Sequence, residues 1–202
     1  MLKAVIFDMG GVLIRTQNRA GREKWAARLG MEAGPFENLI FNGESGHQAQ
    51  LGQKTAKAHW DWVGDHFGLS HSELAELRRD FFSGDVLDEV LLAYIGRLRQ
   101  AGYRLGLLSN AADEVRQTLT EKYPILTNFD GVVISAEVGL MKPDPKIYHL
   151  AVESVGVQAN EAVFVDDFIE NIEGARQVGL QAIHFVDAEK VQQELVAITG
   201  VA

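Results

Sequence analysis

The chain has no cysteine among its 202 residues. Disulfide bonds, a thiolate nucleophile and zinc bound by cysteine are therefore excluded. No uninterrupted apolar run is long enough to span a membrane, and the first residues have the pattern of a core strand rather than of a signal peptide. The net charge of -9 is opposite to the basic surplus of nucleic-acid-binding proteins. We therefore expect a soluble, cytoplasmic protein that binds neither nucleic acid nor a membrane.

The composition is that of a globular protein, with 47% hydrophobic and 23% charged residues. A length of 202 residues is enough for one core domain with a modest insertion. Because the protein is acidic overall, an anionic substrate would need a local positive site, for which a metal ion is suited.

One stretch near the N-terminus has the form of a buried strand that ends in a carboxylate. Residues 4–7 (AVIF) are apolar, Asp8 follows, and Gly10 and Gly11 precede a second apolar run. A strand buried in a parallel sheet is nearly continuous in apolar residues, and ligands bind outside the carboxyl ends of such strands. Asp8 is thus either a functional carboxylate or an aspartate that bonds only to its own turn.

Strand and helix patterns alternate along the second part of the chain, which predicts a parallel sheet with right-handed crossovers. Residues 15–85 lack a strand-like run and show helical patterns instead, with a glycine-punctuated loop at 41–47. We expect an α/β fold in which residues 1–14 and 86–202 form a Rossmann-like parallel-sheet core and residues 15–85 form an inserted all-helical segment. Further strands are expected at 105–110, 131–135, 162–167 and 181–185, and helices within the insertion at 19–29, 55–67 and 70–81.

Polar groups follow the predicted strands or lie in nearby loops. Each has an ordinary structural explanation, because Ser, Asn and Asp cap helices and lysines are usually solvated. The carboxyl ends of parallel strands nevertheless converge on one edge of the sheet. Carboxylates there can hold a hard cation, a lysine and a hydroxyl can bind phosphate, and a free carboxylate can attack phosphorus. The residues concerned are Asp8, Ser109, Asn110, Lys142, Asp166 and Asp167.

The order and spacing of these residues resemble the haloacid dehalogenase superfamily over essentially the whole chain. The four segments that carry the resemblance are DMGGVL at 8–13, LLSN at 107–110, KPDPKIY at 142–148 and VDDFIEN at 165–171. The helical insertion directly after the first segment resembles the type 1 cap of that family. Such a cap would close over the active site, exclude water and contact the substrate.

The resemblance implies a role for each matched residue in a magnesium-dependent phosphohydrolase that acts on a small phosphoester. Asp8 would be the nucleophile and a Mg²⁺ ligand, and the backbone carbonyl of residue 10 would be a second ligand. Asp167 matches the metal-binding acid best, because Asn171 stands four residues further on, and Asp166 is the second choice. Lys142 would steady the nucleophile and the phosphoryl charge. Ser109 would bind the phosphoryl group, with Asn110 adjacent.

One position departs from the family's phosphatases, which usually carry a general acid/base aspartate two residues after the nucleophile. Here that residue is Gly10, and acid/base help is typically worth ~10²–10⁴-fold in rate. The chain is similar in this respect to glycine-containing members that resemble sugar-1-phosphate phosphatases, whose leaving groups depend less on an acid. A 2-haloacid dehalogenase or a catalytically impaired phosphate-binding scaffold are the alternatives.

Two residues of the insertion are candidate substrate contacts. Glu44 and His47 lie in the glycine-rich loop predicted beside the site. The aromatic and histidine residues at 59 and 60 lie on an apolar helical face, so packing explains them.

Overall fold

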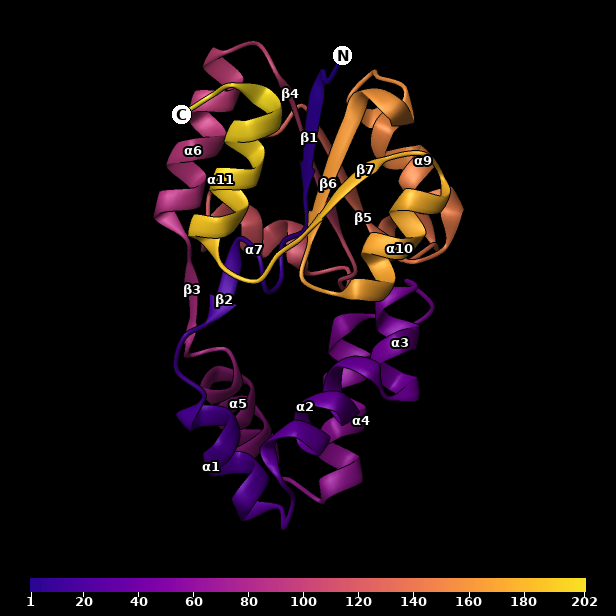
Figure 1. Cartoon of the computed structure of the whole chain (residues 1–202). Helices are drawn as coiled ribbons and strands as arrows, with labels where there is room; N and C mark the ends of the chain where they lie inside the picture. The colour runs from indigo at the N-terminus through magenta and orange to yellow at the C-terminus, as the bar shows by residue number, and fades with distance from the viewer.

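A five-stranded parallel sheet forms the core of the molecule, with the strand order β5-β4-β1-β6-β7 (Figure 1). The computed structural model describes all 202 residues. All neighbouring strands run in the same direction, so their carboxyl ends lie at one edge, as predicted. The strands are β1 (Ala4–Phe7), β4 (Arg104–Ser109), β5 (Gly131–Ile134), β6 (Ala162–Asp166) and β7 (Gln181–His184).

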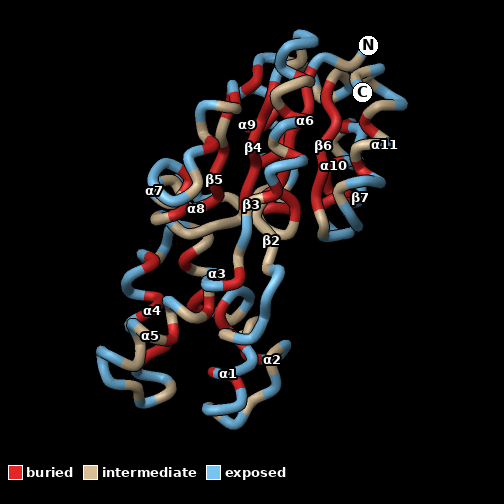
Figure 2. Tube along the Cα trace, turned by 90° about the vertical axis from the view of Figure 1, so that its left-hand side faces the viewer, coloured by how far each residue is buried: buried red, intermediate tan, exposed pale blue.

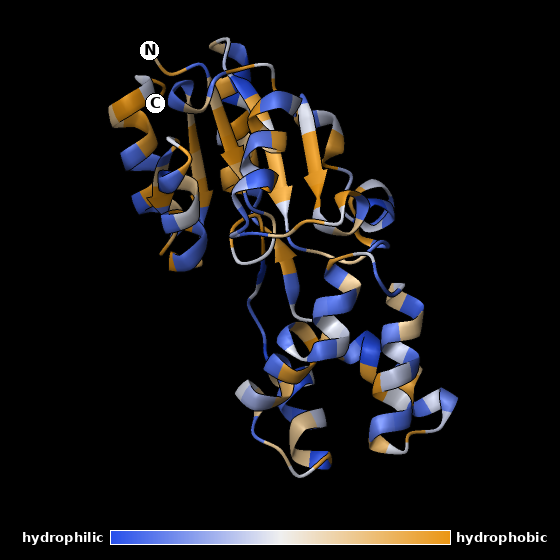
Figure 3. Ribbon diagram, turned by 90° about the vertical axis from the view of Figure 1, so that its right-hand side faces the viewer, coloured by the Kyte–Doolittle hydropathy of each residue, from blue (hydrophilic) through white to orange (hydrophobic).

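Helices cover both faces of this sheet. Helices α6 (Glu89–Gln100) and α11 (Ala188–Thr199) lie on one side, and α9 (Pro145–Ser154) and α10 (Ile169–Gln177) lie on the other (Figure 1). Val5 and Phe7 of β1 pack in the cluster that contains α6 and α11, whereas Ala4 and Ile6 pack with α9 and α10. This alternation is the two-residue period of a strand buried on both faces. Figures 2 and 3 show the strands as buried and hydrophobic along most of their length.

Five helices form a separate unit beyond the carboxyl edge of the sheet (Figure 1). They are α1 (Ala20–Arg28), α2 (Ala33–Asn42), α3 (Glu44–Gln50), α4 (Ala56–Phe67) and α5 (His71–Phe81). We call them the helical unit. Its own core contains the buried residues Trp25, Ala26, Phe36, Ile40, Trp60, Val63, Leu77 and Phe81. Thr55 and Ser70 cap α4 and α5, and Ser70 forms a capping box with Glu73.

Two short strands connect the helical unit to the core. Strand β2 (Ile14–Thr16) pairs antiparallel with β3 (Asp85–Leu87), so the expectation of no strand within 15–85 is wrong at both ends. The two chain crossings, which are the segments that link the core to the helical unit, lie side by side, since Gln17 N donates to Gly84 O at 2.9 Å. A Cβ atom at Gly84 would lie 1.7 Å from Asn18 O, so only glycine allows this approach.

The loop predicted at 41–47 is also wrong. Gly43 is the single residue that separates α2 from α3, and Glu44 and His47 therefore lie on a helix. Gly46 is not a turn residue: a Cβ atom there would lie 2.2 Å from Ile40 O, so this glycine lets two helices pack closely. The remaining elements of the core are α7 (Val115–Glu121), α8 (Ser135–Val138) and the 3-10 turns Leu126–Asn128 and Ala159–Glu161. None of the helices combines the length and apolar character needed to cross a bilayer.

Candidate active site

The carboxyl ends of three central strands bring the predicted polar residues together. Phe7 of β1 is in register with Leu107 of β4 and with Val165 of β6. The next residue along each strand therefore lies at the same height on the sheet edge. Asp8 and Asp166 occupy two of these places, and Asp8 is fixed there because its N–H donates to Val165 O at 2.8 Å.

Lys142 lies between these two carboxylates although it comes from the loop before α9. Its Nζ is 2.6 Å from Asp8 Oδ1 and 2.6 Å from Asp166 Oδ2. The third ammonium donor reaches Leu108 O at 3.2 Å. The lysine side chain is almost fully buried, so its charge depends on these partners rather than on water.

Asp166 has its hydrogen-bonding capacity occupied by the chain itself. Besides Lys142, its Oδ1 accepts from Phe168 N at 2.8 Å, and Asn171 Nδ2 lies 3.0 Å from both oxygens. Asn171 therefore belongs with Asp166, and not with Asp167 as the four-residue spacing predicts. A carboxylate held by so many donors is a fixed structural anion within the site.

Asp167 is different, because one of its oxygens is buried without a partner. Its Oδ1 is inaccessible to solvent and forms no hydrogen bond. Its other oxygen lies against Gly11, where an added Cβ atom would be 2.1 Å from Oδ2. Gly11 also has a φ of 79°, which favours glycine. Oxygens of Asp8, Asp166 and Asp167 lie within 4.8 Å of one another, an arrangement that could hold a cation.

Burial and mutual repulsion perturb the titration of these groups. Burial, together with the charges of Asp166 and Asp167, raises the pKa of Asp8 to about 7 against the opposing effect of Lys142. Burial and Asp166 raise the pKa of Asp167 to about 6. Burial alone would lower the pKa of Lys142, but Asp8 and Asp166 keep it above its ordinary value. Without a further cation, the site holds more negative charge than one lysine balances.

Ser109 and Asn110 occupy the end of β4 and serve different purposes. The Ser109 side chain is buried at the sheet edge. Asn110 is bonded at both ends of its amide: Oδ1 accepts from Lys142 N at 2.8 Å, and Nδ2 donates to Lys142 O at 3.0 Å. The Asn110 side chain, predicted to lie beside the phosphoryl group, therefore fixes the backbone of the lysine.

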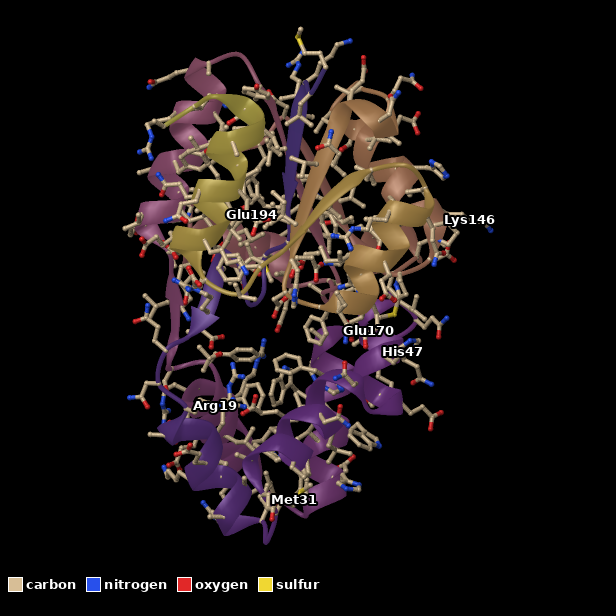
Figure 4. All side chains as sticks on the ribbon, in the orientation of Figure 1. Arg19, Met31, His47, Lys146, Glu170 and Glu194 are labelled. Atoms are coloured by element: carbon tan, nitrogen blue, oxygen red, sulfur yellow. The ribbon has the colours of Figure 1, made fainter.

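The structure does not join the two candidate substrate contacts to this cluster. Glu44 and His47 are exposed on α3, and Glu44 accepts a hydrogen bond from Gln48. Figure 4 shows His47 on the opposite flank of the helical unit from Arg19. Their role in substrate binding stays a prediction. Gly10 lies beside the cluster, and a Cβ atom built on it would meet no atom within 4 Å.

Two surface cavities lie away from the carboxylates. One has a volume of about 620 Å³ and is lined by residues that include Arg78, Phe82 and Lys122. The other, of about 500 Å³, includes Arg15 and Gln192 in its lining. Neither cavity contains a member of the carboxylate cluster. The cluster is the candidate active site because its carboxylates have perturbed pKa values and lie beside a buried lysine, which is typical of functional sites.

Sequence reasoning missed three features of the site. The pairing of Asn171 with Asp166, the packing of Asp167 on Gly11 and the bracing of Lys142 by Asn110 all depend on contacts between loops. Of the three, only the packing of Asp167 on Gly11 had a signal in the sequence. Two consecutive glycines are typical of a tight turn, and a turn can require the positive φ that Gly11 adopts.

The family model of haloacid dehalogenase-like hydrolases matches residues 2–179. The chain therefore belongs to this family, as its motifs predicted. It is 28% identical over 198 residues to the sesquiterpene phosphatase astK of Aspergillus oryzae, covering 98% of this chain and 97% of that protein. It is 25% identical to (S)-2-haloacid dehalogenase 4A of Burkholderia cepacia, covering 90% and 82% of the two chains. Several other relatives are larger, and the chain spans 19% to 37% of their length.

Solved structures share the fold. A haloacid dehalogenase family enzyme of Bacteroides thetaiotaomicron, in complex with magnesium and inorganic phosphate, superposes with a TM-score of 0.76 at 23% identity. The match covers 91% of this chain and 94% of that one. This confirms the α/β class and the parallel-sheet core.

Proposed function

We propose that this protein is a magnesium-dependent phosphohydrolase that cleaves a small phosphorylated metabolite through an aspartyl-phosphate intermediate on Asp8. The observation that carries the proposal is the grouping of three carboxylates, two of them paired with the buried Lys142, with Asp167 Oδ1 buried and unpartnered. Three carboxylates and one ammonium leave a deficit of two positive charges, which a divalent cation would supply.

The residues present fit Mg²⁺, which prefers oxygen ligands and few protein carboxylates. Asp8 and Asp167 would hold it together with the carbonyl of Gly10, and Asp166 would lie behind them because its oxygens are engaged by Lys142 and Asn171. When bound, the ion would neutralise charge on the transferring phosphoryl group. A solved structure of the same fold contains magnesium and inorganic phosphate, which supports magnesium as the ion.

The residues of the chain can perform the remaining steps. Lys142 holds Asp8 Oδ1 and thereby orients Oδ2, which would attack phosphorus as the bond to the leaving oxygen breaks. The N–H groups of Met9 and Gly10 donate to no backbone acceptor, so they are available to phosphoryl oxygens together with the Ser109 hydroxyl. Attack of water on the aspartyl phosphate would release inorganic phosphate and restore Asp8.

The helical unit would act as the cap of this enzyme, corresponding to residues 15–85, with Glu44 and His47 as proposed substrate contacts. Gly10 supports a substrate with a good leaving group, because no side chain at this position can protonate a poor one. A sugar phosphate with an anomeric leaving oxygen meets that requirement.

Dehalogenation of a 2-haloacid is the second candidate, favoured by the similarity to the Burkholderia cepacia enzyme. The same aspartate would then displace a halide from carbon, and no divalent cation would be needed. A phosphate-binding scaffold without turnover is the third.

One experiment separates these three functions. The purified protein is assayed against a panel of phosphorylated metabolites and 2-haloacids, before and after chelation and with Mg²⁺ restored. We expect phosphate release that chelation abolishes and Mg²⁺ restores, and its loss in a folded Asp8→Asn variant. Dehalogenation that survives chelation would overturn the proposal in favour of the second candidate. Phosphate binding without release by any substrate would favour the third.

A further inference from the structure

Two consecutive acidic residues of the core hold two different helices of the helical unit. Asp113 Oδ1 accepts a hydrogen bond from Ala56 N at 2.8 Å, at the start of α4. Glu114 accepts one from Arg78 of α5 and forms an ion pair with it. Neither acidic residue belongs to the carboxylate cluster, and both lie between β4 and α7.

The contact of Asp113 with α4 has the chemistry of a helix cap supplied by another part of the molecule. The first amides of a helix lack partners within it, and negative charge is favourable at that end. Thr55 accepts from Ala58 N at 3.1 Å, and Asp113 satisfies the Ala56 amide. One first-turn donor is thus capped from within the helical unit and another from the core.

This attachment lies to one side of the connecting strands. Figure 2 shows α7 and α8 beside β2 and β3, above α4 and α5. Helix α3 packs against α8, and a Cβ atom at Gly52 would lie 2.2 Å from Ala136 O. The helical unit is therefore joined to the core covalently through the two chain crossings and non-covalently along α7 and α8.

The non-covalent attachment is tied to the site through one short segment, residues 109–114. Ser109 begins it, and Asn110 brackets the backbone of Lys142. Ala111 N donates to Ser135 Oγ at 2.9 Å, and the segment ends at the two acids. A shift of α4 relative to the core must break the bond to Asp113 or move this segment, which carries the hydroxyl proposed to bind the phosphoryl group.

We infer that Asp113 is a positioning residue that, with Glu114, docks the helical unit on the segment that begins at Ser109 and so sets the cap over the bound phosphoester. The inference rests on the proposed function for its catalytic meaning, but the docking itself is measurable without turnover. Substrate entry and product release would require these two bonds to break and form again.

The absence of cysteine makes the docking directly measurable. Lys57 on α4 and Lys146 on α9 are exposed, so Lys57→Cys and Lys146→Cys can carry spin labels without background labelling. We expect a narrow distance distribution in the parent protein and a broader, longer one after Asp113→Ala. Loss of a cap corresponds to roughly a 2- to 30-fold rise in the ratio of undocked to docked molecules. Asp113→Asn retains an acceptor oxygen and should preserve most of the docked population.

Two controls separate docking from general stability. Asp187 caps α11 far from the helical unit by accepting from Lys190 N at 2.8 Å, so Asp187→Ala removes a matched cap and should leave the distances unchanged. If Asp113→Ala fails to fold, Glu114→Gln with Arg78→Met tests the second bond at a half-buried pair. Distances that stay unchanged in every folded docking variant would overturn the inference.

Kinetics provides the catalytic readout. Asp113→Ala should raise KM in proportion to the loss of the docked fraction that the labels report, without lowering kcat, and Asp113→Asn should restore KM. A fall in kcat with an unchanged KM would contradict a docking role. If neither the parent nor any variant turns over a phosphoester, the proposed function fails, while the label distances still decide whether Asp113 docks the helical unit.

Discussion

Lys142 Nζ lies 2.6 Å from Asp8 Oδ1, although the two residues are 134 positions apart in the chain. The same nitrogen lies 2.6 Å from Asp166 Oδ2, so one buried ammonium joins the ends of β1 and β6. This geometry makes the lysine both a part of the site and a condition for its stability, because buried carboxylates without a cation repel one another.

Lys142→Met should therefore destabilise the protein in a pH-dependent way. Removing one partner of a buried ion pair costs about 3–5 kcal/mol, and the loss should be larger at pH 8 than at pH 6, where the unpaired carboxylates take up protons. Urea unfolding at both pH values measures this. The exposed Lys146→Met is the matched control. Equal, small losses for both variants would mean that the buried pair contributes nothing.

Gly11→Ala should weaken metal binding by more than its effect on the stability of the fold explains. The added Cβ atom would lie 2.1 Å from Asp167 Oδ2 and displace that carboxylate. Gly30 is a matched control, since its φ of 71° is similar to the 79° of Gly11 but open space surrounds it. The free energy of unfolding should fall by about 1–2 kcal/mol in both variants, because alanine is unfavourable in the left-handed backbone conformation. Only Gly11→Ala should weaken Mg²⁺ binding in calorimetry, and equal affinities would remove Asp167 from the ligand set.

The parts of this fold that the sequence predicts are those determined locally. Strand β6 is a continuous apolar run that ends in Asp166, and Asp167 follows it; such runs identify buried parallel strands by themselves. The position of Asp8 at the sheet edge follows from the same reasoning. The parallel topology then brings these ends together without any knowledge of side-chain contacts.

Features that depend on contacts between segments were not predictable in this way. Gly46 looks like a turn residue in the sequence, but it permits α3 to approach Ile40 O. Asn171 could have served either neighbouring aspartate, and only the start of α10 decides that it contacts Asp166. Short strands such as β2 have too few residues for a periodic pattern, so their pairing with a distant segment is what defines them.

Mg²⁺ binding should weaken as the pH falls. Burial raises the pKa of Asp8 to about 7 and that of Asp167 to about 6, and a protonated carboxyl must lose its proton before it can ligate. Below these values, protons compete with the ion, and above them they do not. The two pKa values correspond to a loss of about 100-fold in affinity between pH 7.5 and pH 5.5. Calorimetry in buffers of different ionisation enthalpy would count the protons released, and an affinity independent of pH would contradict the ligand assignment.

His59 should make the stability of the protein fall in mild acid. Burial, and secondarily Lys54, lowers the pKa of His59 to about 4, whereas a histidine in the unfolded chain titrates near 6.5. Between these values the unfolded chain binds more protons, so the free energy of unfolding decreases as the pH falls from about 6.5 to about 4.

The decrease due to His59 should amount to about 1–3 kcal/mol. Denaturant unfolding across this range should show it in the parent protein, and His59→Gln should flatten the slope while keeping a polar partner for Ser45, which lies 3.1 Å from the ring nitrogen. The exposed His149→Gln serves as the control. A slope that persists in His59→Gln would place the effect on another group.

Gly10 should make the rate depend steeply on the leaving group. No side chain stands at this position to protonate a departing alkoxide, so aryl, acyl and anomeric phosphates should be cleaved far faster than simple alkyl phosphates.

The structure gives room for the missing acid, since a Cβ atom at Gly10 meets nothing within 4 Å and its backbone is not left-handed. Gly10→Asp should therefore fold, and it should accelerate poor leaving groups most, by up to ~10²–10⁴-fold if the new carboxyl is well oriented. A series of phosphoesters with graded leaving-group pKa, assayed where the chemical step limits the rate, measures both effects. A flat dependence in the parent protein would mean that another group donates the proton, and His47 and Glu44 would then be the first residues to replace, because they are the proposed substrate contacts of the helical unit.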